Sequence, residues 1–199
     1  MEVVENKHTS HTQRRHMETL LSKLRTLATP KSAFIVLALF ILNAIILGKV
    51  DQPLSQLANG EPKLDLRFGY DLATVERLFD AYGEQGRELY VWDLLVDTPF
   101  PVLGGLATIL FVLVAFYNPH WQKALVIAPI TFIVTDLLEN ILFMFLLQSH
   151  PLLSPGLVVF SSFVTQIKRS AFYIIFAELV ISGIIVIFVE TKRMISSRT

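Results

Sequence analysis

The sequence predicts an all-α integral membrane protein, a four-helix bundle with an N-terminal amphipathic interfacial helix and a helical extramembrane cap between spans 1 and 2. Hydrophobic residues make up 53% of the 199 residues, and charged residues make up 17%. The charges are segregated, which leaves four apolar segments that are long enough, or nearly so, to cross a bilayer. These segments lie at about 33–49, 100–117, 124–147 and 170–189. We expect a polar basic arm with an interfacial helix, 1–32, and a single four-span membrane domain, 33–199.

The N-terminal arm, 1–16, is polar, and the residues after it have helical periodicity. Between positions 17 and 28, apolar residues recur on one face and basic residues on the other. This pattern is typical of a helix that lies in the membrane interface, and docking to a partner is the alternative. Pro30 separates this helix from the first span.

The first span, 33–49, is short. Asn43 is its single polar residue before Lys49. A helix of this length reaches about 25 Å, so flanking residues or a thinned bilayer must complete the crossing.

The cap, 50–97, is too long to be a simple connection. Its first part is rich in turn-forming residues such as Pro53, so we expect no regular helix there. Asp71 has the position of a helix N-cap, and Gly83 that of a C-terminal stop. A second helix is expected to begin near Glu84 and to lead into the second span.

The last two spans each contain an irregularity. Pro129 is expected to kink the third span about one turn after its start. The fourth span, 170–189, follows a separate apolar stretch at 156–167. Lys168 and Arg169, between the two, are therefore expected at the outer boundary of the membrane.

Lys and Arg are more frequent on one side of the predicted membrane. Cytoplasmic segments carry an excess of these residues, so we expect both termini on the cytoplasmic or matrix-equivalent side and the cap on the other. The residues assigned to the inner side are Lys7, Arg14, Arg15, Lys23, Arg25, Lys31, Lys123, Lys192, Arg193 and Arg198.

The third span contains two acids and an amide near its middle. Asp136, Glu139 and Asn140 are spaced i, i+3 and i+4, so they share one helix face. Ionisable groups at this depth are unfavourable in lipid and usually face a bundle interior or a water-filled cavity. Asp97, at the mouth of the second span, and Lys168, with its long side chain, can reach the same region.

These residues form the candidate site. Acids beside a cation in a low dielectric can act as a general acid/base, a proton relay or a binding site for a polar headgroup. The alternative is a structural polar network that fixes the helix register. The candidates for catalysis are Asp136 and Glu139, and those for ligand binding are Asp97, Asp136, Glu139, Asn140, Thr165, Lys168 and Arg169.

Glu178 lies mid-span in the last helix, about 180° around the helix from Arg169. It therefore cannot face the same cavity as Arg169. We expect a protonated carboxyl bonded to Ser182 or to a neighbouring helix, with contact to another subunit as the alternative.

Several classes of chemistry are disfavoured. The chain has no Cys, so disulfides and thiolate sites are excluded. It has no Walker, dinucleotide, Gly-x-Ser-x-Gly or His-Glu-x-x-His motif, and no pair of His within a span as a b-type cytochrome requires. The basic arm lacks the interleaved aromatic residues of nucleic-acid-binding segments. We expect no cofactor, no metal and no nucleic acid.

Five features together resemble a family. They are Gly-Tyr-Asp at 69–71, GEQGRELY at 83–90, DTPFP at 97–101, DLLEN at 136–140 and Lys168. The chain resembles a family of small uncharacterised four-span integral membrane proteins over about 64–189. The resemblance implies the four-helix architecture and no activity. Sterol-isomerase-like four-span domains are similar in size, but their His and Glu pattern does not match this chain.

Two hypotheses from different classes follow. The first is a non-enzymatic accessory or structural subunit of a larger membrane complex, with membrane lipids and other membrane subunits as partners. The second is a membrane-embedded enzyme or binder that acts on a lipid-like molecule through Asp136 or Glu139. Proton-coupled transport is a further alternative.

Overall fold

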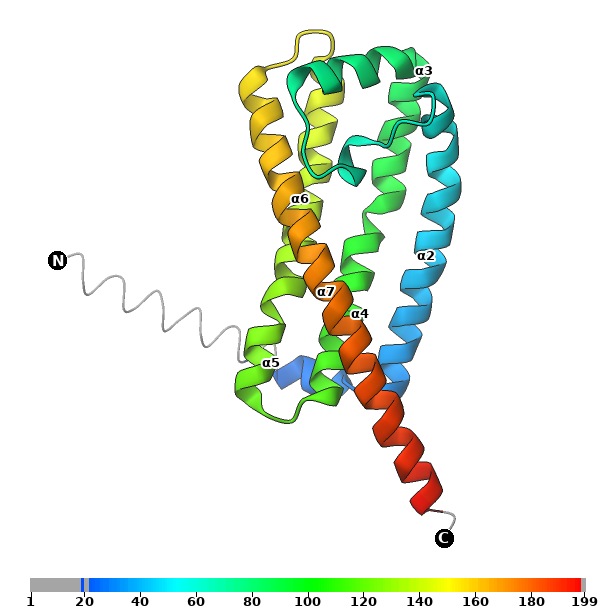
Figure 1. Ribbon diagram of the computed structural model, residues 1–199, viewed down its shortest axis with the longest axis vertical. Helices are drawn as coiled ribbons and strands as arrows, with labels where there is room; N and C mark the ends of the chain where they lie inside the picture. The colour runs from blue at the N-terminus through cyan, green and yellow to red at the C-terminus, as the bar shows by residue number, and fades with distance from the viewer. Residues whose placement is uncertain (1–18, 20–21, 198–199) are drawn as a thin grey trace, which may run out of the picture.

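Helices form most of the chain in the computed structural model, which describes residue 19 and residues 22–197. Residues 22–27 are helical, and no strand occurs in the described ranges. The longer elements run nearly side by side, and α7 crosses the others obliquely (Figure 1). In chain order the elements are α2 (Pro30–Leu57), η1 (Leu64–Leu66), α3 (Leu72–Asp97), α4 (Pro99–Ala115), α5 (Pro119–Leu125), α6 (Ile127–Ser149) and α7 (Pro155–Ser196).

Four helical segments are long and apolar enough to cross a membrane, as the sequence predicts. They are Pro30–Leu57, Leu72–Ala115, Pro119–Ser149 and Pro155–Ser196. α4 packs against α2, α6 and α7, so it joins the other long helices. The helical residues 22–27 and the end of α7 lie at one end of the molecule, and the first half of α3 covers the opposite end (Figure 1).

α2 continues beyond the predicted end of the first span. The sequence predicts irregular structure from position 50, whereas the helix passes through Pro53 and ends at Leu57. Burial outweighs the local signal of the proline, because Leu54 and Ala58 are packed in the main hydrophobic cluster. The helix ends before Asn59, which has a positive φ of 52°.

The irregularity of the third span lies at a different residue from the one predicted. α5 ends at Leu125 and α6 begins at Ile127, so the break falls at Val126. Pro129 lies one turn after this break, and it cannot donate the hydrogen bond that would join it to the Leu125 carbonyl oxygen. The helix is therefore interrupted next to Pro129, in the turn that precedes the proline.

α7 is one continuous helix of 42 residues. The predicted separation between 156–167 and the fourth span is wrong, because no proline or glycine interrupts the chain between them. Lys168 and Arg169 therefore lie within a continuous helix. At the rise of an α-helix, Lys168 lies about 20 Å along the axis from Pro155.

The first half of α3 lies across one end of the long helices and is called the cap below (Figure 1). The Asp71 carboxylate accepts a hydrogen bond from the Thr74 N–H at 2.9 Å, which caps the helix. Gly83, with φ 61° and ψ −169°, breaks the helical geometry and redirects the chain into the second half of α3. α4 then begins at Pro99.

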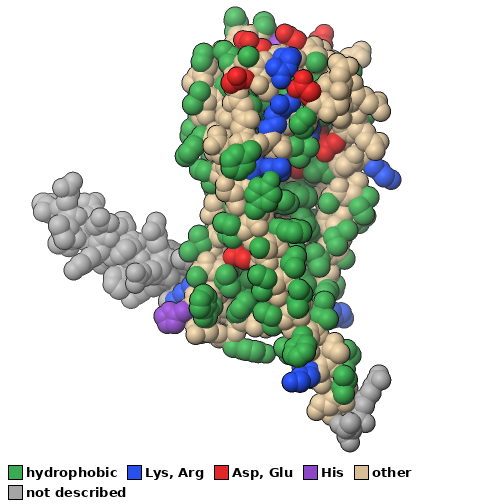
Figure 2. Space-filling view, in the orientation of Figure 1, with side chains coloured by type: hydrophobic (Ala, Val, Ile, Leu, Met, Phe, Trp, Pro, Cys, Tyr) green, Lys and Arg blue, Asp and Glu red, His purple; other side chains and the backbone are tan. Residues whose placement is uncertain are grey.

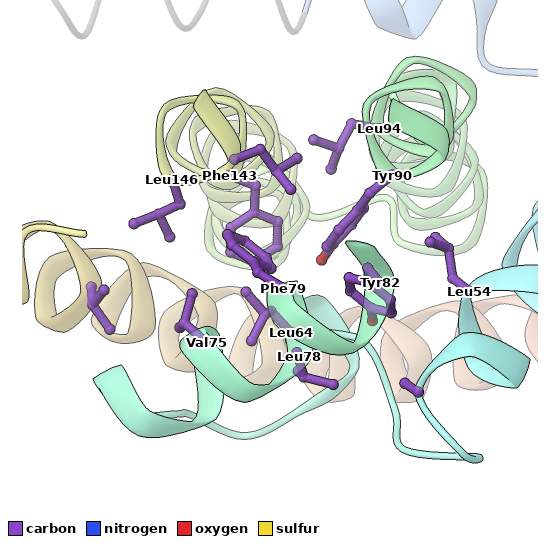
Figure 3. Close-up of a cluster of buried hydrophobic side chains, with 13 residues drawn as sticks. Leu54, Leu64, Val75, Leu78, Phe79, Tyr82, Tyr90, Leu94, Phe143 and Leu146 are labelled. Atoms are coloured by element: carbon purple, nitrogen blue, oxygen red, sulfur yellow. The ribbon is translucent and has the colours of Figure 1, made fainter. Parts of the chain in front are cut away.

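The main hydrophobic cluster lies between the cap and the helices below it. Figure 3 shows Phe79 of the cap, Tyr90 of the second half of α3 and Phe143 of α6 turned toward one another. The Tyr90 ring lies edge-on to that of Phe79, with centroids 6.4 Å apart. Burial of each such side chain contributes about 1.5–3 kcal/mol, so this cluster holds the cap over the bundle.

The described part of the predicted interfacial helix, residues 22–27, contacts the bundle. Leu24 packs against a small buried cluster at the end of α4. Arg25 donates hydrogen bonds from Nε and a terminal nitrogen to Gln122 Oε1, at 2.9 and 2.6 Å. The rest of the predicted helix before Ser22, apart from Thr19, lies outside the described residues.

Candidate ligand-binding site

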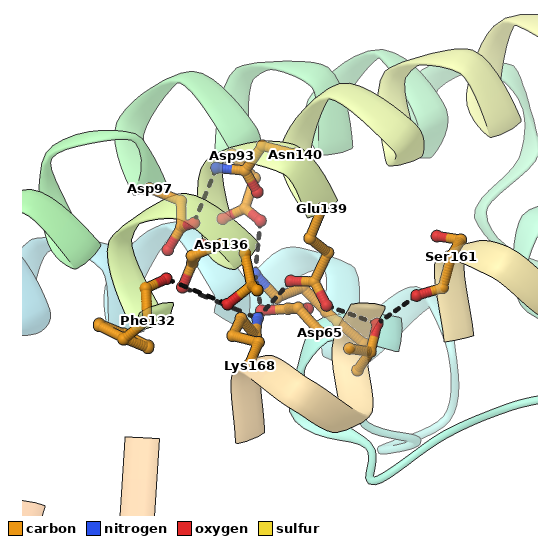
Figure 4. Close-up of polar contacts among 12 residues, drawn as sticks. Asp65, Asp93, Asp97, Phe132, Asp136, Glu139, Asn140, Ser161 and Lys168 are labelled. Carbon is orange, nitrogen blue, oxygen red and sulfur yellow. Dashed lines mark hydrogen bonds and ion pairs between the residues drawn. The ribbon is translucent and has the colours of Figure 1, made fainter. Parts of the chain in front are cut away.

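A buried ion pair joins the middle of α6 to α7. α6 and α7 are antiparallel neighbours, which brings Lys168 level with the acidic turn of α6. The Lys168 ammonium is paired with Glu139 Oε2 and lies 3.9 Å from Asp136 Oδ2 (Figure 4). All three side chains are buried. The structure therefore brings together the acids and the cation that the sequence predicts for this site.

Glu139 is fully engaged by protein groups. Its second oxygen, Oε1, accepts a hydrogen bond from the Thr165 hydroxyl at 2.5 Å. Beside Thr165, the Tyr70 hydroxyl donates to Ser161 Oγ at 2.8 Å. Burial raises the pKa of Tyr70, so this hydroxyl stays protonated and remains a donor. Glu139 thus holds α6, α7 and the cap segment in register.

A second buried cation, Lys63, lies in the segment between α2 and η1. Its ammonium is 2.5 Å from Asp51 Oδ1, 2.5 Å from Asp93 Oδ2 and 3.6 Å from Asp65 Oδ2. Burial alone would lower the pKa of Lys63, but the three carboxylates outweigh it and raise this pKa. Lys63 ties the end of α2 to α3.

Asp97 and Asn140 form a third contact in the same region. Asn140 Nδ2 donates to Asp97 Oδ2 at 3.1 Å, from α6 to the end of α3. Asp97 has no cationic partner within ion-pair distance among the described residues. The Oδ1 atom of Asp136 is also buried without a hydrogen-bond partner. Both carboxylates therefore have unused acceptor capacity.

A cavity of about 130 Å³ lies next to these two carboxylates. Its wall combines acids, cations and phenyl rings, and it includes Asp97 and Asp136 but not Glu139. The lining residues are Leu47, Asp51, Asp65, Leu66, Asp97, Phe100, Phe132, Asp136, Lys168, Arg169 and Phe172. The acidic turn of α6 is thus divided, because Glu139 faces protein partners and Asp136 faces the cavity.

Arg169 lines the cavity without joining the ion pairs. Its guanidinium lies 5.8 Å from the centroid of the Tyr173 ring. Its Nε is buried and has no hydrogen-bond partner. Arg169 forms no ion pair with another residue in the part of the chain that the structure covers. It is therefore a cation beside the cavity with free donors.

Sequence reasoning missed the centre at Lys63. Three of its partners, Asp51, Asp65 and Asp93, come from different segments of the chain. The available signal was the position of a single Lys among several acids in the turn-rich segment after α2. Only the path of that segment across the bundle brings the four residues together.

Charged side chains concentrate at the capped end of the molecule. Figure 2 shows them gathered over the cap, while hydrophobic side chains cover much of the face below. Around the cavity, the carboxylates outnumber the cations Lys63, Lys168 and Arg169. The arrangement can therefore accept positive charge from a ligand.

Glu178 lies away from this site, ten residues or about 15 Å further along α7. The Ser182 hydroxyl donates to the main-chain carbonyl oxygen of Glu178 at 2.5 Å. The predicted hydrogen bond from Ser182 to the carboxyl is therefore wrong, and the Glu178 Oε2 atom has no partner. Glu178 lines an open groove between α6 and α7, which also includes Ala128 and Ala171.

Comparison of the sequence with models of protein families gives no match, and neither characterised proteins nor solved structures give one. The interpretation of the site therefore rests on its own geometry.

Proposed function

We propose that this chain is a multi-pass membrane protein that binds the polar end of a lipid-like molecule in the cavity beneath the cap. The observation that carries the proposal is the cavity wall, where Asp97, Asp136 and Arg169 keep unused hydrogen-bonding capacity next to phenyl rings. A cavity with an apolar lining and a few polar groups is typical of ligand sites. It lies among helices that are apolar enough to be surrounded by lipid.

The topology belongs to the same proposal. We place both termini on the cytoplasmic or matrix-equivalent side and the cap on the other side, because Lys and Arg are more frequent near the termini. The arm and interfacial helix, 1–32, would then lie on the inner surface, and 33–199 would form one membrane domain. The cavity would open in the outer half of the bundle.

Binding is favoured over catalysis by the roles of the two acids. Glu139 is held by Lys168 and Thr165 and does not line the cavity, so it acts as a structural group. Asp136 and Asp97 both line the cavity and keep acceptor capacity for a ligand. We therefore assign Asp136 and Asp97 to ligand binding.

The variant Asp136→Asn tests this proposal. We expect it to lose most of the lipid that co-purifies with the wild-type protein in mild detergent, because the amide removes a carboxyl group from the cavity wall. Native mass spectrometry of the purified protein measures the retained lipid. Asp80→Asn is the matched control, because Asp80 is an exposed carboxylate in the cap. Equal lipid retention by the wild type and both variants would refute the proposal.

A subunit role is the second candidate, favoured by the groove at Glu178. A carboxyl with an unpartnered oxygen in an apolar span suits contact with a donor on a neighbouring helix, and the adjacent Ala128 and Ala171 permit close approach. We expect mild-detergent extracts to contain this chain in a larger assembly that Glu178→Gln weakens. Native sizing measures this, and a monodisperse monomer for the wild type would rule it out.

A further inference from the structure

The chemical class of the ligand follows from the groups left without partners around the cavity. We infer that the ligand carries a primary ammonium group linked to a phosphate, with the ammonium between Asp97 and Asp136 and the phosphate at Arg169. This inference rests on the proposed function, since it names the headgroup that the cavity would hold.

The acidic side of the cavity favours a cation that donates hydrogen bonds. Asp136 is 2% exposed, and its Oδ1 atom has no donor. Asp97 is 8% exposed and accepts its hydrogen bond from the neutral amide of Asn140. A buried carboxylate is costly unless it is paired and hydrogen-bonded. A ligand with both a positive charge and N–H donors would satisfy the two groups together.

An ammonium group fits this wall better than a metal ion. Within residue 19 and 22–197, no three His, Asp or Glu side chains are arranged so that they could hold a metal. The wall also carries Phe100, Phe132 and Phe172, whose rings attract alkylammonium groups and are poor metal ligands. The Phe132 and Phe172 centroids are 5.7 Å apart, so the rings form a continuous apolar surface beside Asp136.

Hydrogen bonding separates a primary from a quaternary ammonium. A primary ammonium has three N–H donors, whereas a trimethylammonium group has none. The Asp136 Oδ1 atom and the free acceptor positions of Asp97 need donors. The cavity of about 130 Å³ has room for a small ammonium group.

Arg169 provides the counterpart for the phosphate. Its guanidinium has a buried Nε without a partner and, among residue 19 and residues 22–197, no carboxylate within ion-pair distance, unlike Lys168, which is paired with Glu139. A guanidinium binds phosphate oxygens through two parallel N–H bonds. Asp136 and Arg169 both line the cavity, so an ammonium and a phosphate separated by a short linker can reach both.

The experiment compares three phospholipids that share acyl chains and differ in headgroup. The full-length wild type is purified in mild detergent and exchanged with phosphatidylethanolamine, phosphatidylcholine or phosphatidylglycerol, and bound lipid is measured by native mass spectrometry. We expect phosphatidylethanolamine to be retained about tenfold more than the other two, because only its headgroup donates charged hydrogen bonds to both acids. Soluble phosphoethanolamine is added as a competitor, and displacement at millimolar concentration would indicate that a free phosphoamine is also accepted.

Two variants make the outcome specific. Asp97→Asn is expected to abolish the preference for phosphatidylethanolamine, and Arg169→Gln is expected to weaken retention of all three lipids. The wild-type comparison needs no variant, so it stays informative if a variant fails to fold. Equal retention of the three lipids, still dependent on Asp136, would overturn the amine assignment and leave the proposed function intact. No retention of any lipid would overturn both.

Discussion

The capped half of the bundle and the opposite half are held together by different contacts. Beneath the cap, two buried ammonium groups, Lys63 and Lys168, join five segments of the chain through carboxylates. In the opposite half, α4 packs on α2 and α7 through apolar residues such as Leu110 and Phe111. Removing one partner of a buried ion pair leaves an uncompensated charge and strongly lowers the free energy of unfolding. Truncating an apolar side chain lowers it by an amount that grows with the volume of the cavity left behind. The capped half should therefore be the more sensitive to single substitutions.

The largest effect is expected for Lys168→Met. The substitution keeps an apolar stem but leaves Glu139 and Asp136 buried without their cation. Loss of one partner of a buried pair costs about 3–5 kcal/mol. Unfolding in mixed detergent micelles measures the change, and Lys49→Met, at an exposed position of α2, is the control. Equal destabilisation by the two substitutions would contradict a network at Lys168.

A smaller effect, about 3 kcal/mol, is expected for Lys63→Met. Asp51 and Asp65 are 24% and 14% exposed, so water can partly replace the lost cation. Because the folded protein raises the pKa of Lys63, the stability that this ammonium supplies is fully present below its usual pKa of 10.5. That stability is lost only as the pH rises through the pKa of the folded state. Alkaline pH up to 10 should therefore remove none of the stability supplied by Lys63 in the wild type, as unfolding at several pH values would measure.

The smallest effect tests the apolar packing of the other half. A Cβ atom at Gly105 would lie 2.5 Å from Ile133 Cδ1 and 3.2 Å from the Pro129 carbonyl oxygen. The Ile133 side chain can move but the backbone oxygen cannot easily, so Gly105→Ala should cost about 1 kcal/mol. Gly183→Ala is the control, because nothing lies within 4 Å of its added Cβ. Equal stability of the two alanine variants would show that α4 and α6 do not pack closely at Gly105.

The sequence predicts the four long apolar segments and the acidic face of α6 because both depend on local spacing. Asp136, Glu139 and Asn140 share a face in any α-helix, and Gly83 readily adopts the positive φ at which the chain turns. These features need no knowledge of the neighbouring helices.

Errors arose where tertiary contacts or helix continuity decide the outcome. Pro53 is accommodated within α2 because Leu54 is buried against the cap. Lys63 was missed because Asp51 and Asp93 lie on two helices, α2 and α3, which only the folded chain brings to Lys63. Glu139 is bonded to Thr165, whereas Asp136 lines the cavity. This difference depends on the position of α7, which the spacing of residues along α6 does not give.

The length of α7 has a consequence for how the molecule sits in lipid. At 42 residues the helix is about 63 Å long, roughly twice the thickness of the hydrocarbon layer. A helix of this length extends beyond the hydrocarbon layer even when it is strongly tilted. The ends of α7 therefore do not define where the membrane boundaries lie along it. On the proposed topology, the final turns of α7, with Lys192 and Arg193, would project as a basic extension into the aqueous phase opposite the cap.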